Sequence, residues 1–104
     1  MLKGRPAIGT VTGTGSAINV SLGFTPTCVI LVNQTDPGMF IWMNTMADAK
    51  AVKLTDAPAL TFAGSNGISP YAGVAGSASE GFTIGADSDL NAPSDVLHYI
   101  AFGE

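Results

Sequence analysis

Helical periodicity is almost absent from the chain, whereas short segments carry either a period of two in their large aliphatic residues or apolar residues throughout, as strands do. The clearest example is the segment AINVSL at residues 17–22, in which every second residue is a large aliphatic one. Such alternation is typical of a strand with one buried face. Other segments are apolar throughout and are separated by glycine- and proline-rich turns. The pattern predicts strands at residues 7–12, 17–22, 28–33, 39–44, 51–55, 59–63, 82–86 and 96–102.

The connections between these strands carry further expectations. Residues 7–12 and 17–22 are expected to form a hairpin across a glycine-rich turn. Residues 64–81, rich in glycine and serine, are expected to be a long connection with a short strand near Ile68 or Val74. The best helical candidate is the segment NTMADAKAV at residues 44–52, which is long enough for one or two turns.

Seven to nine short strands spaced by about ten residues predict an all-β fold. The expected architecture is an antiparallel two-sheet β-sandwich, jelly-roll-like, with at most one short helix near residues 44–52. Residues 1–104 are expected to form a single domain. Residues 1–6, which contain Lys3 and Arg5, are either a frayed terminus or an arm that docks on a neighbouring subunit.

Two of the predicted strands, residues 28–33 and 39–44, are apolar on both faces. Because successive side chains of a strand point to opposite faces, a two-layer core covers only one of them. The second face is expected to be covered either by residues 64–81 or by a neighbouring subunit. The candidate interface residues are Met39, Phe40, Ile41, Trp42, Met43, Lys3 and Arg5.

Composition and charge narrow the classes of partner. Charged residues make up 12% of the chain and the net charge is −4, with no basic patch, so direct binding of nucleic acid is not expected. No segment approaches the roughly 20 apolar residues that span a bilayer, and the N-terminus lacks a signal-peptide pattern. We expect synthesis in a reducing cytoplasm, no membrane contact and no cofactor.

The segment GADSDLNAPSD at residues 85–95 is the one candidate metal site. Asp87, Asp89 and Asn91 occupy alternate positions, as the first oxygen ligands of a calcium loop do. Counting from Asp87, however, places Ala92 where such a loop has glycine and His98 where it has a bidentate glutamate. The favoured interpretation is a structured polar turn held by local hydrogen bonds.

No residue pattern indicates catalysis. Cys28, the only cysteine, lies among β-branched residues and is expected to be a buried thiol rather than a nucleophile. His98, the only histidine, has no signalled partner and is expected in the core or at an interface. The chain is therefore not expected to be an enzyme.

Three segments carry a resemblance to a known class: GFTPTCVILVN, ISPYAG and the ending GFTIGADSDLNAPSDVLHYIAFGE. They resemble small virion surface proteins of tailed bacteriophages, of the head decoration or cement type or the related β-sandwich modules of tails and fibres. The resemblance implies a structural protein without catalytic residues, made in the bacterial host cytoplasm and located on the virion head surface. It also implies a homotrimer that contacts the major capsid protein and stabilises the head.

The same resemblance leaves an alternative open. The chain would then be a tail or fibre-tip module that recognises a host surface glycan, with residues 85–95 as its ligand or calcium loop. Trp42 and Tyr71 would serve as stacking platforms for sugar rings, provided that both side chains are exposed.

Overall fold

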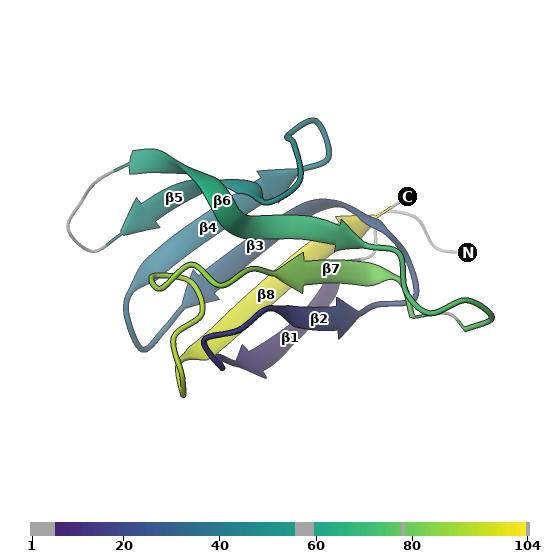
Figure 1. Cartoon of the computed structure of the whole chain (residues 1–104), viewed down its shortest axis with the longest axis horizontal. Helices are drawn as coiled ribbons and strands as arrows, with labels where there is room; N and C mark the ends of the chain where they lie inside the picture. Colours follow the sequence, from purple (N-terminus) through teal and green to yellow (C-terminus); the bar gives the residue numbers. More distant parts are fainter. Residues whose placement is uncertain (1–5, 56–59, 78, 104) are drawn as a thin grey trace.

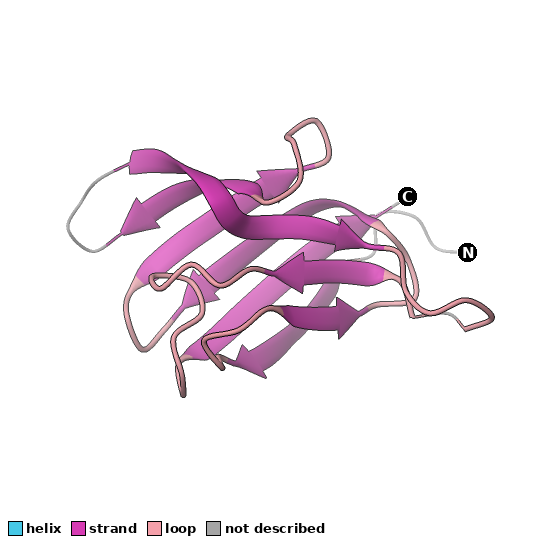
Figure 2. Ribbon diagram, in the orientation of Figure 1, coloured by secondary structure: helices cyan, strands magenta, loops and turns pink. Residues whose placement is uncertain are grey.

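The computed structural model describes residues 6–55, 60–77 and 79–103. Within these residues the fold is all-β, with eight strands and no helix, and hence no helix that could span a membrane (Figure 2). The strands are β1 (Ala7–Thr12), β2 (Ile18–Ser21), β3 (Pro26–Asn33), β4 (Gly38–Met43), β5 (Lys50–Thr55), β6 (Leu60–Tyr71), β7 (Gly81–Ile84) and β8 (Val96–Gly103). Every pairing between them is antiparallel, as the number and spacing of the short strands predicted.

The eight strands form one continuous sheet in the order β1-β8-β3-β4-β5-β6-β7-β2. The sheet curls into a half-barrel, so that β6, β7 and β2 pass in front of the other strands (Figure 1). The long strand β6 makes this possible, because its first half pairs with β5 and its second half with β7. The register shifts between Lys50 and Ala51, where β6 bends away. The predicted two-sheet sandwich is therefore not confirmed.

The predicted hairpin between residues 7–12 and 17–22 is wrong. β1 pairs with the last strand, β8, and β2 pairs with β7, so the two are the opposite edges of the sheet. The loop between them bonds to residues 91–95 instead of closing a ladder. Gly13 donates to the Asp95 carbonyl at 2.7 Å and accepts from the Ser94 amide at 3.0 Å. A Cβ at Gly13 would collide with the Ala92 carbonyl, so this close approach requires glycine.

The helix expected near residues 44–52 is absent from the described structure. Residues 44–49 form turns, and strand β5 begins at Lys50. Ala49 has a φ of 67°, a left-handed conformation through which a right-handed helix cannot continue. The chain pairs with β6 from Lys50 and also with β4 from Val52, so tertiary pairing overrides the local helix propensity.

The expected long connection at residues 64–81 is shorter than predicted. Residues 64–71 continue β6, and the strand expected near Ile68 is the second half of that element. Ile68 is fully buried, whereas Val74 is exposed in the loop that follows. Because this half of β6 lies over the concave side of the curl, it covers the inner face of the sheet and not the outer one (Figure 1).

The hydrophobic core fills the inside of the curl. Trp42 and Phe40 from β4 belong there to the same buried cluster as Phe82 and Ile84 from β7, and Leu90 from the β7–β8 loop is also fully buried. The Trp42 indole N–H donates to the Ala47 carbonyl at 3.3 Å, so its polar atom is satisfied. The remaining core residues are Val29, Leu31, Ala51, Ala63, Ile68, Leu97 and Ala101.

Candidate interaction face

The convex side of the sheet, which points away from the core, is apolar across six strands. We call it the outer face: the outward side chains of β1, β8, β3, β4, β5 and the first half of β6. Directly opposite residues of antiparallel strands share a face, so the strand register defines its composition. One row runs Ile8–Ile100–Ile30–Ile41–Val52–Phe62. Every member of this row is a β-branched aliphatic residue or phenylalanine.

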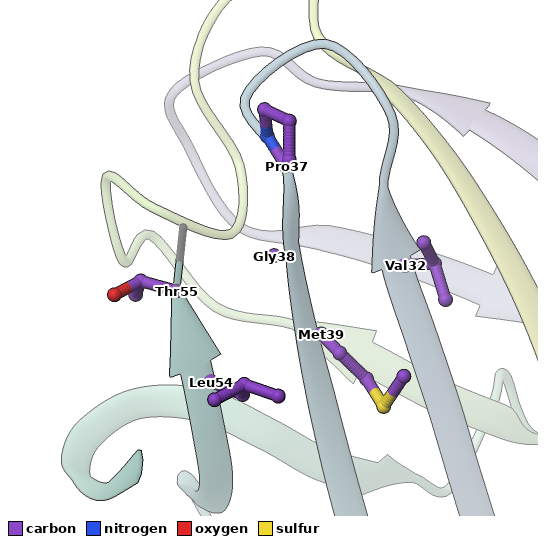
Figure 3. A pocket seen from close by; sticks show the side chains of 6 residues that line it. All are labelled: Val32, Pro37, Gly38, Met39, Leu54 and Thr55. Atoms are coloured by element: carbon purple, nitrogen blue, oxygen red, sulfur yellow. The ribbon is translucent and has the colours of Figure 1, made fainter. Parts of the chain in front are cut away.

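A second row lies beside the first and is more exposed. It runs Thr10–His98–Val32–Met39–Leu54–Leu60. Val32, Met39 and Leu54 line a shallow depression of about 290 Å³ together with the start of β4 (Figure 3). Another depression of about 240 Å³, lined by Ile8, Ile30 and Ile100 among others, lies toward β1. Both depressions are on the outer face.

Exposure of large apolar side chains is concentrated on this face. Among the described residues, nine large hydrophobic residues are more than about a third exposed. Eight of the nine belong to the outer face: Ile8, Val32, Met39, Met43, Leu54, Leu60, Phe62 and Val96. Isolated apolar residues are ordinary on protein surfaces, but a contiguous apolar patch marks a site of interaction.

The outer face is also nearly free of charge. No strand in the described part of the chain contains Asp or Glu, and Lys50, whose ammonium donates to the Gly64 carbonyl at 3.0 Å, stands at one end. His98, which lies opposite Val32 on this face, is a polar group there, and its Nε2 lies 2.6 Å from Oε1 of Gln34. An uncharged face can be buried without the cost of removing ions from water.

No protein family, curated protein or solved structure matches the chain.

The structure divides the predicted interface residues between the two faces of β4. Met39, Ile41 and Met43 lie on the outer face, as an interface requires. Phe40 and Trp42 are 0% and 2% exposed and point into the core, so they are removed from the candidate interface. Lys3 and Arg5 lie outside the described residues. Four further residues of the outer face were not predicted from the sequence, because only the strand register places them there: Ile8, Leu54, Leu60 and Phe62.

The loop at residues 85–95 closes one end of the half-barrel. Lys53, on the inner side of β5, stands 5.7 Å from the centroid of the Phe40 ring. Its ammonium lies 2.8 Å from Asp89 and 3.1 Å from Asp87. The hydrogen bond that the Lys53 ammonium donates to Asp89, aided by Asp87, raises the pKa of Lys53 above its ordinary value. The two aspartates of the candidate metal site thus neutralise a cation of the protein itself.

Asn91 stabilises the loop through hydrogen bonds to backbone groups. It is fully buried, and its Oδ1 accepts from the Thr14 amide at 2.8 Å and the Gly15 amide at 3.4 Å. Its Nδ2 donates to the carbonyls of Ser16 at 2.7 Å and Gly85 at 3.0 Å. Asn91 therefore ties the β1–β2 loop to the β7–β8 loop. Its side chain does not converge with those of Asp87 and Asp89 on one point.

The far end of the loop is fixed by a buried polar pair. Asn33 Nδ2 donates to Asp95 Oδ2 at 2.8 Å, and Asn33 Oδ1 accepts from the amides of Thr35 and Asp36. Every buried polar side-chain atom in the described residues has a hydrogen-bond partner. In that same part of the chain, no three histidine, cysteine or acidic side chains gather as they would around a metal ion.

Cys28 and His98 both lie on the outer face, but far apart. Cys28 pairs with Phe102 and His98 pairs with Val32, so four residues of β3 separate their positions. At about 3.3 Å per residue this separation is roughly 13 Å, too long for a nucleophile and its base. Burial raises the pKa of the Cys28 thiol, which disfavours the reactive thiolate.

Proposed function

We propose that the chain is a non-enzymatic structural protein that works by assembly, as a decoration protein on the head surface of a tailed bacteriophage. The observation that supports assembly is the outer face, an apolar and almost uncharged surface across six strands. Burying such a surface against protein gains free energy from the hydrophobic effect and removes an aggregation hazard. The virion location is supported by the resemblance of three sequence segments to phage surface proteins.

The positions of the charged side chains are also consistent with assembly. The charges in the β7–β8 loop are used internally, because Asp87 and Asp89 bond Lys53, and Asp95 bonds Asn33. These groups stabilise the end of the half-barrel and leave the outer face as the surface available to partners. A two-layer β-sandwich would form where this face meets a second surface, since a sheet with two apolar faces needs cover on both.

The glycan-binding alternative loses part of its support. Trp42, one of the two proposed stacking platforms, is 2% exposed and cannot present its ring to a sugar. Tyr71, the other, is half-buried at the end of β6. A carbohydrate site built on aromatic stacking needs an exposed ring face.

Head shells lacking the chain are expected to bind it in a co-sedimentation assay, whereas purified tails are not. The reason is that a decoration protein binds the repeating capsid lattice at many equivalent positions. A calcium chelator is expected to leave binding unchanged, because Lys53 occupies the space between Asp87 and Asp89. Binding to tails with none to heads would contradict the head location. Loss of binding on chelation would favour the calcium-dependent glycan module.

A further inference from the structure

We propose that the partner of the outer face is a second copy of this chain, packed sheet against sheet across a two-fold axis. The inference rests on the proposed function in one respect: it takes assembly to be what the outer face serves.

The chemistry of the outer face is self-complementary. A surface that meets its own copy must carry no large charge of one sign, since like charges would then face each other. The central row, Ile8–Ile100–Ile30–Ile41–Val52–Phe62, carries no charge at all. The acidic residues of the described chain lie in turns and loops, so two copies could approach without opposing their carboxylates. Among the described residues of this face, by contrast, an acidic partner would find only Lys50, at one end, and a basic partner would find no carboxylate on its strands.

The exposed area is sufficient for a stable pair. Eight large apolar residues of the outer face are exposed by between 36% and 73%. Taking roughly 200 Å² for a fully exposed large side chain, they present on the order of 800 Å². A standard protein–protein interface buries about 800 Å² from each partner. The central row crosses six strands spaced by about 4.8 Å, so the patch is roughly 24 Å wide.

The number of patches favours a two-fold pair over a ring. A cyclic trimer joins two different patches of each subunit, whereas a two-fold dimer uses one patch twice. In the described part of the chain, eight of the nine exposed large hydrophobic residues gather on one face, and Val74 stands alone in a loop. One patch per chain fits the dimer. This differs from the trimer that the sequence resemblance implies.

Pairing would also complete the architecture that the sequence predicts. Two sheets with the same twist pack face to face at about 10 Å, with their strands within roughly 30° of each other. The outer side chains of β3 and β4 would then lie in a second core between the two copies. Strands that are apolar on both faces, such as residues 28–33 and 39–44, are what such a central layer needs.

Sedimentation velocity on three chains tests the pairing: wild type, Met39→Glu and Val74→Glu. Met39 is 36% exposed near the middle of the outer face, and Val74 is 63% exposed away from it, so glutamate is tolerated at both sites in the isolated fold. At about 100 μM, wild type and Val74→Glu are expected at twice the 10.5 kDa chain mass. Met39→Glu is expected at the single-chain mass, because pairing would bury its carboxylate without a partner. Phe62→Glu, at a site 70% exposed, provides a second variant if Met39→Glu misfolds.

Each outcome separates this inference from the function on which it rests. A monomeric or trimeric wild type, or folded Met39→Glu and Phe62→Glu chains that still pair, would overturn the two-fold pairing. A monomeric chain that nonetheless binds head shells would overturn the pairing alone and leave the decoration role standing. A paired chain that binds no head shell would overturn the decoration role and leave the pairing standing.

Discussion

Replacement of Trp42 by alanine is expected to lower the free energy of unfolding by about 3–5 kcal/mol. Trp42 is the largest fully buried side chain, lies opposite Val29 on β3, and donates its indole N–H to the Ala47 carbonyl. Removing it leaves a cavity in the core inside the curl, which the surrounding structure can fill only in part by relaxing. Urea denaturation monitored by far-UV circular dichroism, a backbone signal that does not require Trp42, measures the loss of unfolding free energy.

Met43→Ala provides the matched control for this prediction. Met43 is the next residue on β4 but points to the outer face, where it is 43% exposed. Its truncation in the dilute, unassembled chain is expected to cost less than about 1 kcal/mol. A loss below about 0.5 kcal/mol for Trp42→Ala, or equal losses for the two variants, would show that the inner and outer faces of β4 are wrongly assigned.

Replacement of Asn91 by alanine is expected to cost about 2–4 kcal/mol. The Asn91 amide bonds the Thr14 amide and the carbonyls of Ser16 and Gly85. Its loss leaves these backbone groups without their partner, and each buried group left unsatisfied costs about 1–3 kcal/mol, less where water can enter. Thermal unfolding with and without urea measures the change.

Asn19→Ala tests whether the loss of stability comes from the link that Asn91 makes between the two loops or would follow the removal of any asparagine side chain. Asn19 lies on the exposed side of β2 and accepts one hydrogen bond from Thr83 at 2.7 Å. Its removal is expected to cost less than about 1 kcal/mol, because water replaces the lost partner. Equal destabilisation by the two substitutions would contradict the view that Asn91 joins the two loops.

The strands were predictable because their signal is local. Alternation and turn residues report on one segment at a time, and residues 7–12 coincide with β1 while residues 28–33 lie within β3. Pairing is not local: β1 bonds to β8 at the other end of the chain, so adjacency in sequence wrongly predicted a hairpin with β2. The helix failed for a related reason, since pairing of β5 with two neighbours overrides its helix-forming residues.

Part of the outer face could be predicted from the sequence. The period of two already required Met39, Ile41 and Met43 to share one face, and Phe40 and Trp42 the other. Which of the two faces is buried depends on the direction in which the sheet curls, and no local pattern reports it. The rows that extend the surface to Ile8 and Phe62 depend on the register of five strand pairs.

The loop at residues 85–95 could also be predicted only in part: its local turn structure was predictable, and its long-range contacts were not. Position counting predicted a structured turn, and the hydrogen bonds of Asp87 and Asn91 agree with that interpretation. The hydrogen-bond partners of the loop could not be predicted, because Lys53 lies 34 residues from Asp87 and Thr14 lies 77 residues from Asn91. Such contacts appear only once the sheet order is known.

Carbene footprinting of the chain bound to head shells, the particle that the proposed function requires, compared with the dilute free chain, tests the central claim most directly. The claim is that the outer face is the surface covered on assembly. Labelling of Ile8, Leu60 and Phe62, each at least 69% exposed in the single chain, is expected to fall several-fold on assembly. Val74, 63% exposed but off this face, serves as the internal reference and is expected to keep its labelling. Unchanged labelling of the outer face on the assembled particle would contradict the account.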